Sequence, residues 1–360
     1  MLTIKAAVCL AFNEPLKIEE VELRAPVEGE VQVKLEACAV CHSDITFIEG
    51  GWGGSLPAVY GHEAAGRVVA IGSGVQAYAV GDAVIVTLIR SCGTCLCCTT
   101  GAPVLCEAEY NNDSGPLSFP GGGRLQQGLA VGGFAEQVVV DQSQLAAIPS
   151  DVSMVAASLL SCGVITGVGA VVNTAGIRPG QTVVVIGAGG VGLNAIQGAR
   201  IAGARHIIAI DMNADKLTAA KEFGATDSIL ATEEKPWKTV HNIVGRGVDA
   251  VFITVGAISI YDTAPRYLAP GGKLIMVGMP HTGEQSNYEP VVIAALGQSL
   301  IGTKMGDTVL ARDIPWLVDL YQQGRLKLDE LVSRRWPLEQ INEAIADTSS
   351  GAARRNVIVF

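Results

Sequence analysis

Alternation of apolar and polar residues dominates the first part of the chain and predicts short β-strands. Val31 to Ala37 alternates as a strand does when one of its faces is buried. Shorter apolar runs follow at Arg67 to Gly72, Asp82 to Leu88 and Phe134 to Val140, each bounded by turn residues. Residues 107–133 lack periodicity and are rich in Gly, Asn and Pro, which predicts a long surface loop. We therefore expect a β-rich, barrel-like domain here.

After about residue 150 the pattern changes to strands that alternate with helices. Ser153 to Asn173 has helical spacing, and Thr182 to Gly187 is an apolar strand of the kind that is buried on both faces. The same alternation continues with helices at Gly190 to Ala202 and Asp215 to Phe223 and strands at His206 to Asp211, Ala250 to Val255 and Lys273 to Gly278. This order predicts βαβ units and a doubly wound α/β sheet.

The two patterns also suggest where the domains divide. The alternation ends near residue 303, and the final strand-like run, Val357 to Phe360, is expected to return to the first domain. We therefore expect a β-rich domain of residues 1–163 and 304–360, and a doubly wound domain of residues 164–303. A length of 360 residues agrees with two domains.

Composition excludes several classes of protein. A net charge of −10 and a pI near 5.0 argue against a nucleic-acid partner, because such proteins present a basic face. No run of 18 or more apolar residues occurs, so we expect no membrane span. The N-terminal residues alternate like a strand and lack the layout of a signal peptide. We therefore expect a cytoplasmic enzyme or binding protein.

Cysteine spacing carries the most specific signal. Of nine cysteines, five fall within residues 92–106, which favours metal ligation over disulfides in a reducing compartment. Four of them form a C-x2-C-x2-C-x7-C pattern: Cys92, Cys95, Cys98 and Cys106. A closed shell of four thiolates is typical of structural zinc, so we expect a zinc lobe at about residues 90–110. The spacing of three leaves Cys97 without a ligand role.

A second motif predicts a nucleotide site. The run of Gly187, Gly189, Gly190 and Gly192 fits G-x-G-x-x-G, follows a strand and opens a helix. Asp211 ends the next strand about 20 residues on, where a carboxylate accepts hydrogen bonds from the ribose hydroxyls and repels a 2′-phosphate. NAD is therefore favoured over NADP, and Lys216 is a further candidate ribose contact.

Three other residues suggest an open metal shell. Cys41, His62 and Cys162 would leave a fourth position free for water or substrate, as in catalytic zinc sites. Spacing alone supports this set weakly, because a single buried cysteine more often serves as a small apolar residue. On these residues alone, simple burial in the core stays open as an explanation.

Taken together, these motifs resemble zinc-dependent alcohol dehydrogenases of the medium-chain dehydrogenase/reductase superfamily. The resemblance spans essentially the whole chain, with all the motifs in the family's order. Its segments are Cys41-His42-Ser43-Asp44, Gly61-His62-Glu63, the four spaced cysteines, Cys162 to Gly167, and Gly187 to Gly192 with Asp211. It implies a GroES-like catalytic domain, a Rossmann NAD-binding domain and two zinc ions per chain.

The resemblance also implies a role for each matching residue. Cys41, His62 and Cys162 would bind the catalytic zinc, with Glu63 behind them and Asp44 fixing the His62 tautomer. A zinc-bound alkoxide would pass hydride to NAD, reversibly between alcohol and aldehyde or ketone, while Ser43 takes the hydroxyl proton. The remaining cofactor contacts would be His42 and Arg355 at the pyrophosphate, and Thr166 and Val191 at the nicotinamide.

Two departures from the family narrow the expected substrate and the proton route. Thr46 stands where many members have a relay histidine, which leaves the proton route beyond Ser43 open. Gly50 to Gly54 carries no acid, which disfavours a thiol-dependent formaldehyde dehydrogenase. Ungapped counting puts Trp52, Leu88 and Met279 in an apolar substrate pocket, although each is equally consistent with core packing.

The motifs also bear on catalysis and assembly. A non-catalytic relative that binds NAD and zinc is disfavoured, because pure binding needs no open zinc shell. The family resemblance and the long loop favour a homodimer over a tetramer.

Overall fold

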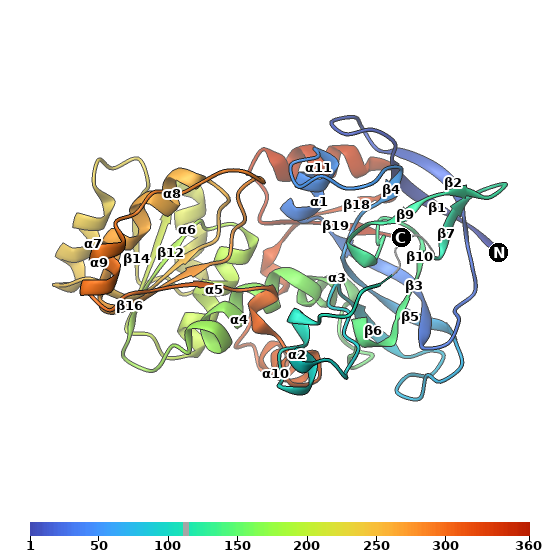
Figure 1. The fold of residues 1–360 in the computed structure, drawn as a ribbon, viewed down its shortest axis with the longest axis horizontal. Coiled ribbons are helices and arrows are strands. Elements are labelled where there is room, and N and C mark those ends of the chain that lie inside the picture. Colours follow the sequence, from blue (N-terminus) through green and yellow to red (C-terminus); the bar gives the residue numbers. More distant parts are fainter. Residues whose placement is uncertain (111–114) are drawn as a thin grey trace. The chain divides into compact units, whose positions relative to one another are not determined.

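The computed structural model describes residues 1–110 and 115–360 and divides into two compact units (Figure 1). Unit 1 consists of Met1–Gly163 and Val309–Phe360, and unit 2 of Val164–Thr308. The second boundary falls after Thr308, not at residue 304. Residues 305–308 pack on unit 2, where a Cβ atom added to Gly169 would lie 2.3 Å from the Gly306 carbonyl oxygen.

Unit 1 contains two β-sheets. The first has six strands in the order β8 (Gly123–Arg124), β7 (Leu117–Phe119), β2 (Lys17–Leu23), β1 (Leu2–Cys9), β4 (Ala58–Val59) and β9 (Gln126–Gln127). The second runs β11 (Leu145–Ala147), β6 (Ala83–Val86), β5 (Glu63–Ile71), β3 (Glu30–Ala39), β19 (Arg355–Val359) and β18 (Val332–Pro337), with β10 (Gln137–Asp141) also paired to β3. The inner faces share one apolar core with Leu35 and Phe134 fully buried.

Strand β3 organises the second sheet. It pairs with β5 over nearly its whole length, while β10 meets its first half and β19 its last three residues. The C-terminal strand therefore lies inside the sheet of unit 1, as the sequence pattern predicted for Val357 to Phe360.

Unit 2 is a six-stranded parallel sheet with helices around it (Figure 1). Its order is β14 (Asp227–Leu230), β13 (His206–Asp211), β12 (Thr182–Ile186), β15 (Val248–Ile253), β16 (Leu268–Met276) and β17 (Ser299–Gly302). Chain order reverses between β12 and β15, which is where doubly wound sheets bind ligands at the carboxyl ends of their strands. The predicted doubly wound sheet is confirmed.

The helices complete both units. Unit 1 contains α1 (His42–Ile48), α2 (Leu96–Thr99), α3 (Met154–Leu159), α10 (Leu310–Gln322) and α11 (Ile341–Ser349). Unit 2 contains α4 (Ile165–Gly169), α5 (Gly190–Ile201), α6 (Ala214–Phe223), α7 (Pro236–Val244), α8 (Ile258–Thr263) and α9 (Pro290–Ala295).

The prediction of a long surface loop over residues 107–133 is wrong for part of its length. Residues 111–114 lie outside the described residues, but β7, β8 and β9 all fall within the predicted loop. These strands have two or three residues each, too few to show alternation. Buried Leu117, Leu125 and Val131 attach the segment to the core of unit 1.

The helical stretch Met154–Ala175 closely matches the helix predicted over Ser153 to Asn173, but it is more apolar than the sequence analysis indicated. Its length and a mean hydropathy of 2.1 would suit a membrane span, yet 89% of its most apolar window is buried inside the protein. This burial is typical of a core helix. The sequence shows no long apolar run there because Gly, Ser, Thr and Asn interrupt it. Two π-helical segments, Leu160–Val164 and Ala170–Ala175, divide it.

Candidate active site and metal centres

Four buried side chains from separate parts of unit 1 meet at one point. Cys41, His62, Glu63 and Cys162 each offer one ligand atom, and these atoms all lie within 4.8 Å of one another. Cys41 precedes α1, His62 directly precedes β5, Glu63 is the first residue of β5, and Cys162 lies in the π-helical segment. The fold therefore brings together a set of residues that is widely spread in the sequence.

The π-helical segment is tied directly to β5. Ser161 donates a hydrogen bond of 2.9 Å from Oγ to the Ala64 carbonyl, one residue beyond Glu63. A π turn widens the helix and shifts the residues within it, and such turns are frequent at functional sites. Cys162 is thus positioned by a backbone irregularity that spacing rules do not detect.

Asp44 holds the imidazole and its surroundings in place. Its Oδ1 lies 2.9 Å from His62 Nδ1 and accepts a 3.0 Å hydrogen bond from the Gly61 backbone, while its Oδ2 accepts one of 3.1 Å from the Cys41 backbone. Burial alone would lower the pKa of His62, but Asp44 and the Cys41 thiol outweigh it and raise that pKa to about 10.

The atoms that face one another suit a cation. Both His62 Nε2 and Glu63 Oε1 are buried and have no hydrogen-bond partner in the part of the chain that the structure describes. Cys162 lowers the pKa of Cys41 well below its ordinary value, against the effect of burial and with further help from His62. Two cysteine sulfurs and an imidazole nitrogen without a partner among the described residues form the donor set that zinc prefers.

The four spaced cysteines form a second, different group. The sulfurs of Cys92, Cys95, Cys98 and Cys106 also lie within 4.8 Å of one another, and all four residues are half-buried. The Cys92 sulfur accepts hydrogen bonds from the backbones of Thr94 (3.5 Å) and Cys95 (3.3 Å). No carboxylate or imidazole joins this group among the described residues, and neither does Cys97.

In unit 2, the glycine motif makes the turn from β12 into α5. A Cβ atom on Gly187 would lie 2.5 Å from Val255, and one on Gly192 only 1.8 Å from the Gly187 carbonyl, so neither position accepts a side chain. By contrast, a Cβ on Gly189 meets nothing within 4 Å, which leaves the N-terminus of α5 open. Such an N-terminus attracts phosphate groups.

Asp211 ends β13 beside this turn. Its Oδ2 accepts a 2.7 Å hydrogen bond from the Ala188 backbone, and its Oδ1 one of 2.9 Å from the Asn213 backbone. Each carboxylate oxygen keeps a second lone pair for a ligand hydroxyl. The acid predicted to bind ribose therefore lies next to the predicted phosphate turn.

Comparisons with known proteins agree with this geometry. A family model for the alcohol dehydrogenase GroES-like domain matches residues 27–150, and one for zinc-binding dehydrogenases matches residues 190–323. An NDMA-dependent alcohol dehydrogenase from Amycolatopsis methanolica is 35% identical over 99% of this chain and 98% of its own length.

The chain belongs to the zinc-dependent alcohol dehydrogenases.

Further similarities support this assignment. A probable S-(hydroxymethyl)glutathione dehydrogenase from Schizosaccharomyces pombe is 36% identical over 99% of this chain and 97% of its own. The crystal structure of benzyl alcohol dehydrogenase from Acinetobacter calcoaceticus has a TM-score of 0.93, 30% identity and complete coverage of both chains. The predicted family, the GroES-like and Rossmann folds, and an NAD-dependent zinc enzyme that acts on alcohols are confirmed.

Several predicted site residues of this alcohol dehydrogenase have unexpected neighbours. Arg355 is only 6% exposed and its Nη2 pairs with Glu63 Oε2, so it contacts the metal group of unit 1. Its predicted contact with the cofactor pyrophosphate stays a prediction, as does that of exposed His42. Thr46 donates a 3.0 Å hydrogen bond to the His42 carbonyl, back into its own helix.

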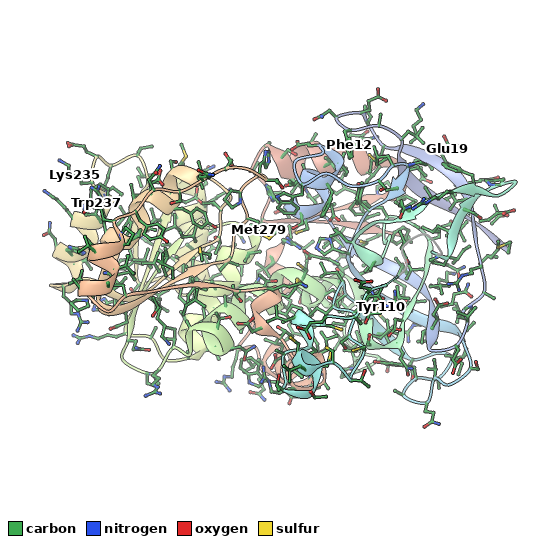
Figure 2. All side chains as sticks on the ribbon, viewed as in Figure 1. Phe12, Glu19, Tyr110, Lys235, Trp237 and Met279 are labelled. Carbon is green, nitrogen blue, oxygen red and sulfur yellow. The ribbon has the colours of Figure 1, made fainter. Side chains whose placement is uncertain are left out.

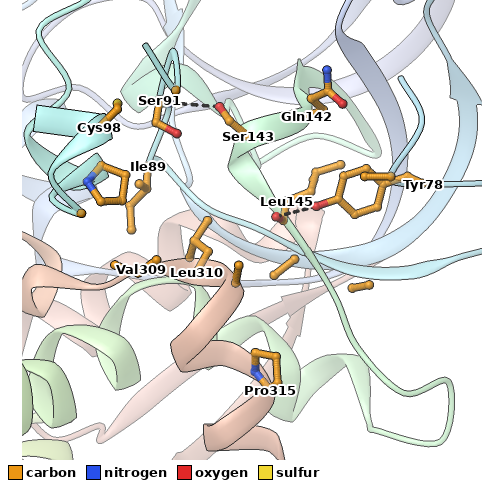
Figure 3. Close-up of a pocket in the computed structure, with 17 residues that line it drawn as sticks. Tyr78, Ile89, Ser91, Cys98, Gln142, Ser143, Leu145, Val309, Leu310 and Pro315 are labelled. Atoms are coloured by element: carbon orange, nitrogen blue, oxygen red, sulfur yellow. Dashed lines mark hydrogen bonds between the residues drawn. The ribbon is translucent and has the colours of Figure 1, made fainter. Parts of the chain in front are cut away.

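The three residues predicted to line the substrate pocket have different surroundings. Trp52 lies edge-on to Phe47, with ring centroids 5.3 Å apart, and Leu88 packs on the core of unit 1. Met279, labelled in Figure 2, belongs to unit 2. Its side chain is 58% exposed. A cavity of about 570 Å³ in unit 1 lies elsewhere, between Ile89, Leu145 and Leu310, and none of the three predicted residues lines it (Figure 3).

Some contacts were missed by sequence reasoning. In unit 2, Met305 Sδ lies 3.8 Å from the Thr166 hydroxyl, and the Thr254 hydroxyl donates a 2.9 Å hydrogen bond to Gly187 O, in the phosphate turn. In unit 1, the Tyr110 hydroxyl contacts Cys106 of the four-cysteine group, and Ser161, next to Cys162, bonds to the Ala64 carbonyl. None belongs to a motif. Thr254 lies inside the run predicted as a strand, but β15 ends at Ile253, which places Thr254 at the carboxyl end of the strand, where doubly wound sheets bind ligands.

Proposed function

We propose that Cys41, His62 and Cys162 hold the catalytic zinc of this alcohol dehydrogenase, with Glu63 as a reserve ligand. The observation that carries the proposal is the buried His62 Nε2, which faces two thiols and has no other partner among the described residues. A buried polar atom left unpaired costs about 1–3 kcal/mol, and a metal bond would remove that cost. Cys92, Cys95, Cys98 and Cys106 are proposed to hold a second, structural zinc, which makes two per chain.

The residues around the catalytic group are proposed to have different roles in orienting the ligands and moving the proton. Bound zinc supplies Lewis-acid activation of an alcohol hydroxyl, and NAD accepts the hydride. Asp44 orients His62 and fixes its tautomer. Ser43, half-buried on the first turn of α1, is proposed to accept the hydroxyl proton. Because the Thr46 hydroxyl is committed to the His42 carbonyl, the proton is proposed to leave Ser43 through water or the cofactor ribose.

Unit 2 is proposed to bind NAD in preference to NADP. Gly187, Gly189, Gly190 and Gly192 would receive the pyrophosphate at the N-terminus of α5, and Asp211 with Lys216 would bind the adenosine ribose. Thr166 and Val191 would pack against the nicotinamide, and His42 and Arg355 would approach the pyrophosphate. The open space at Gly189 and the free lone pairs of Asp211 support this arrangement.

A medium-sized or aromatic alcohol is the proposed substrate class. Trp52, Leu88 and Met279 are apolar, and the likeness to a benzyl alcohol dehydrogenase points the same way. The second candidate is a thiol-dependent formaldehyde dehydrogenase, which the likeness to an S-(hydroxymethyl)glutathione dehydrogenase favours. Against it, Gly50 to Gly54 offers no charge for such an adduct.

A cytoplasmic homodimer is the proposed assembly. Strand β17 ends the sheet of unit 2 and pairs only with β16 among the described strands, so its other edge is available. Nearby α9 exposes apolar side chains, among them Val291 at 71%. An open strand edge beside apolar surface is typical of a region that a second copy covers. A tetramer would need a further interface.

One assay tests the reaction and separates the candidates. Purified enzyme is mixed with a panel of primary, secondary and aromatic alcohols, with NAD and NADP in parallel, and reduced nicotinamide is followed by absorbance. Turnover with NAD is expected, strongest for aromatic alcohols. Formaldehyde oxidation only on addition of glutathione would support the second candidate. Absence of turnover both with every alcohol and with formaldehyde plus glutathione would contradict both candidates.

The cofactor preference has its own test. Asp211→Ser should weaken NAD binding about 10- to 100-fold, because hydrogen bonds to a charged group contribute about 1.5–3 kcal/mol. NADP binding should weaken less or improve. Isothermal titration of both cofactors measures this, and the exposed Asp215→Asn serves as a charge-matched control on α6. An unchanged ratio of the two affinities in D211S would contradict the assignment.

A further inference from the structure

Two side chains close the zinc lobe at its ends. Arg90 stands just before the first spaced cysteine and Tyr110 just after the last, and the Arg90 guanidinium carbon lies 3.9 Å from the centroid of the Tyr110 ring. Tyr110 is labelled in Figure 2. A cation stacked on an aromatic face contributes about 0.5–2 kcal/mol. This stacked pair is called the Arg90–Tyr110 clamp below.

The clamp is attached to the sheet of unit 1. Arg90 Nη2 lies 3.7 Å from Asp141 Oδ2 at the end of β10, and both groups are largely shielded from water. The other oxygen of Asp141 accepts a 2.9 Å hydrogen bond from the Ser143 backbone, and the Ser143 hydroxyl accepts one of 3.0 Å from the Ser91 backbone. The entry to the lobe is therefore fixed to regular structure at two adjacent residues.

On its inner side the clamp reaches one of the four cysteines. The Tyr110 hydroxyl lies 3.7 Å from Cys106 Sγ, which also accepts a 3.3 Å hydrogen bond from the Cys92 backbone. A metal-bound thiolate carries no proton, so in that state the tyrosine hydroxyl is the donor. Groups that hydrogen-bond to metal ligands orient them and tune their hold on the metal.

We propose that the Arg90–Tyr110 clamp is a positioning device that retains the structural zinc, with Tyr110 hydrogen-bonded to the Cys106 thiolate and Arg90 holding the ring in place. The inference rests on the proposed zinc in the lobe. Its physical basis is twofold. The stacking contact closes the lobe even without metal, which lowers the ordering cost of binding. The hydroxyl stabilises the charge on one ligand out of four.

The test uses the full chain with Cys41→Ala, so that the lobe holds the only zinc. Tyr110→Phe in this background removes the hydroxyl and keeps the ring, and Tyr78→Phe is the matched control. Tyr78 is also half-buried in unit 1 and donates its hydroxyl to a carbonyl, that of Leu145 at 2.7 Å, instead of to a sulfur. Zinc loss to an excess of a chromogenic chelator is followed by absorbance.

Tyr110→Phe should accelerate zinc loss about 10-fold, the lower end for groups that support metal ligands, and Tyr78→Phe should not. After cobalt replaces zinc, the sulfur-to-cobalt charge-transfer band should shift in Y110F alone, a change that general destabilisation does not produce. Arg90→Met should accelerate zinc loss by a similar factor, with little further effect when combined with Y110F.

The outcomes separate this inference from the proposed metal content. If the lobe binds zinc and the rates and spectra of Y110F and Y78F coincide, the clamp is overturned while the zinc lobe stands. A parent protein whose lobe takes up neither zinc nor cobalt overturns both. Alcohol turnover plays no part in either conclusion, so failure of the proposed reaction would leave this result intact.

Discussion

The catalytic candidate takes its ligands from three places in the chain and buries all of them, whereas the lobe takes four from fifteen consecutive residues and leaves each half-exposed. At the buried group, His62 Nε2 has no hydrogen-bond partner among the described residues, and a bound cation would pair with it. At the lobe, backbone N–H groups and Tyr110 already surround the sulfurs. One site is built by the tertiary fold and the other by local chain geometry, so their failures should differ.

The largest expected effect follows from removing a ligand at the buried group. Cys41→Ala should lower kcat by at least about 1,000-fold, because metal activation is worth several kcal/mol in the transition state. NAD affinity should be unchanged, since the glycine turn and Asp211 lie in the other unit. Steady-state kinetics, metal analysis and cofactor titration measure this. Cys9→Ala is the control, a buried cysteine outside both metal groups, and a C41A enzyme with near-normal kcat would sink the catalytic assignment.

Two adjacent cysteines, one a proposed ligand and the other not, test the zinc lobe. Cys98→Ser should remove one zinc and lower the apparent melting temperature by about 10 °C, because a metal present at about 1,000 times its Kd stabilises the folded state by roughly 4 kcal/mol. Cys97→Ser, one residue away and outside the sulfur group, should change neither. Metal analysis and calorimetry distinguish them. Equal zinc loss in both variants would show that the spacing of three was misassigned.

The support around each ligand gives an intermediate effect. Asp44→Asn keeps the size of the side chain but weakens its hold on His62 Nδ1. Zinc affinity at the buried group should fall about 10- to 100-fold, with the lobe zinc retained. Competition with a chelator of known affinity measures this. Only the zinc at the buried group should be affected, because Asp44 supports that group alone. Equal loss of both zinc ions in D44N would show that the two sites are not independent.

The smallest effect should come from Thr46. Its hydroxyl is bonded within α1, so Thr46→Ala should change kcat by less than about twofold, far below the 100-fold typical of a proton-transfer residue. Ser43→Ala should lower kcat by about 100-fold, because Ser43 is the proposed proton acceptor. Steady-state kinetics of both variants over a range of pH measure the two effects. A tenfold loss in T46A would place Thr46 on the proton route after all.

Features set by local chain geometry could be predicted from the sequence, and features set by tertiary contacts could not. The lobe cysteines and the glycine turn were readable because their geometry is local, and β12, α5 and β13 appear where the apolar pattern put them. Cys162 depended on the family resemblance, since a π-helical turn leaves no mark in residue spacing. Strands β7 to β9 were missed because two or three residues cannot show alternation. The contact of Arg355 with Glu63 joins distant strands, which no local pattern encodes.

The place of β19 inside the sheet of unit 1 has a consequence for synthesis on the ribosome. In the sequence, unit 2 is inserted between the two segments of unit 1. Roughly 190 residues are therefore translated after Gly163 before Arg355 appears, which takes about 10–40 s at usual elongation rates. During that interval β3 lacks one neighbour and the Glu63 carboxylate lacks its arginine. The unit made second is thus complete first, and the nascent first unit stays exposed to chaperones and proteases until its last strand arrives.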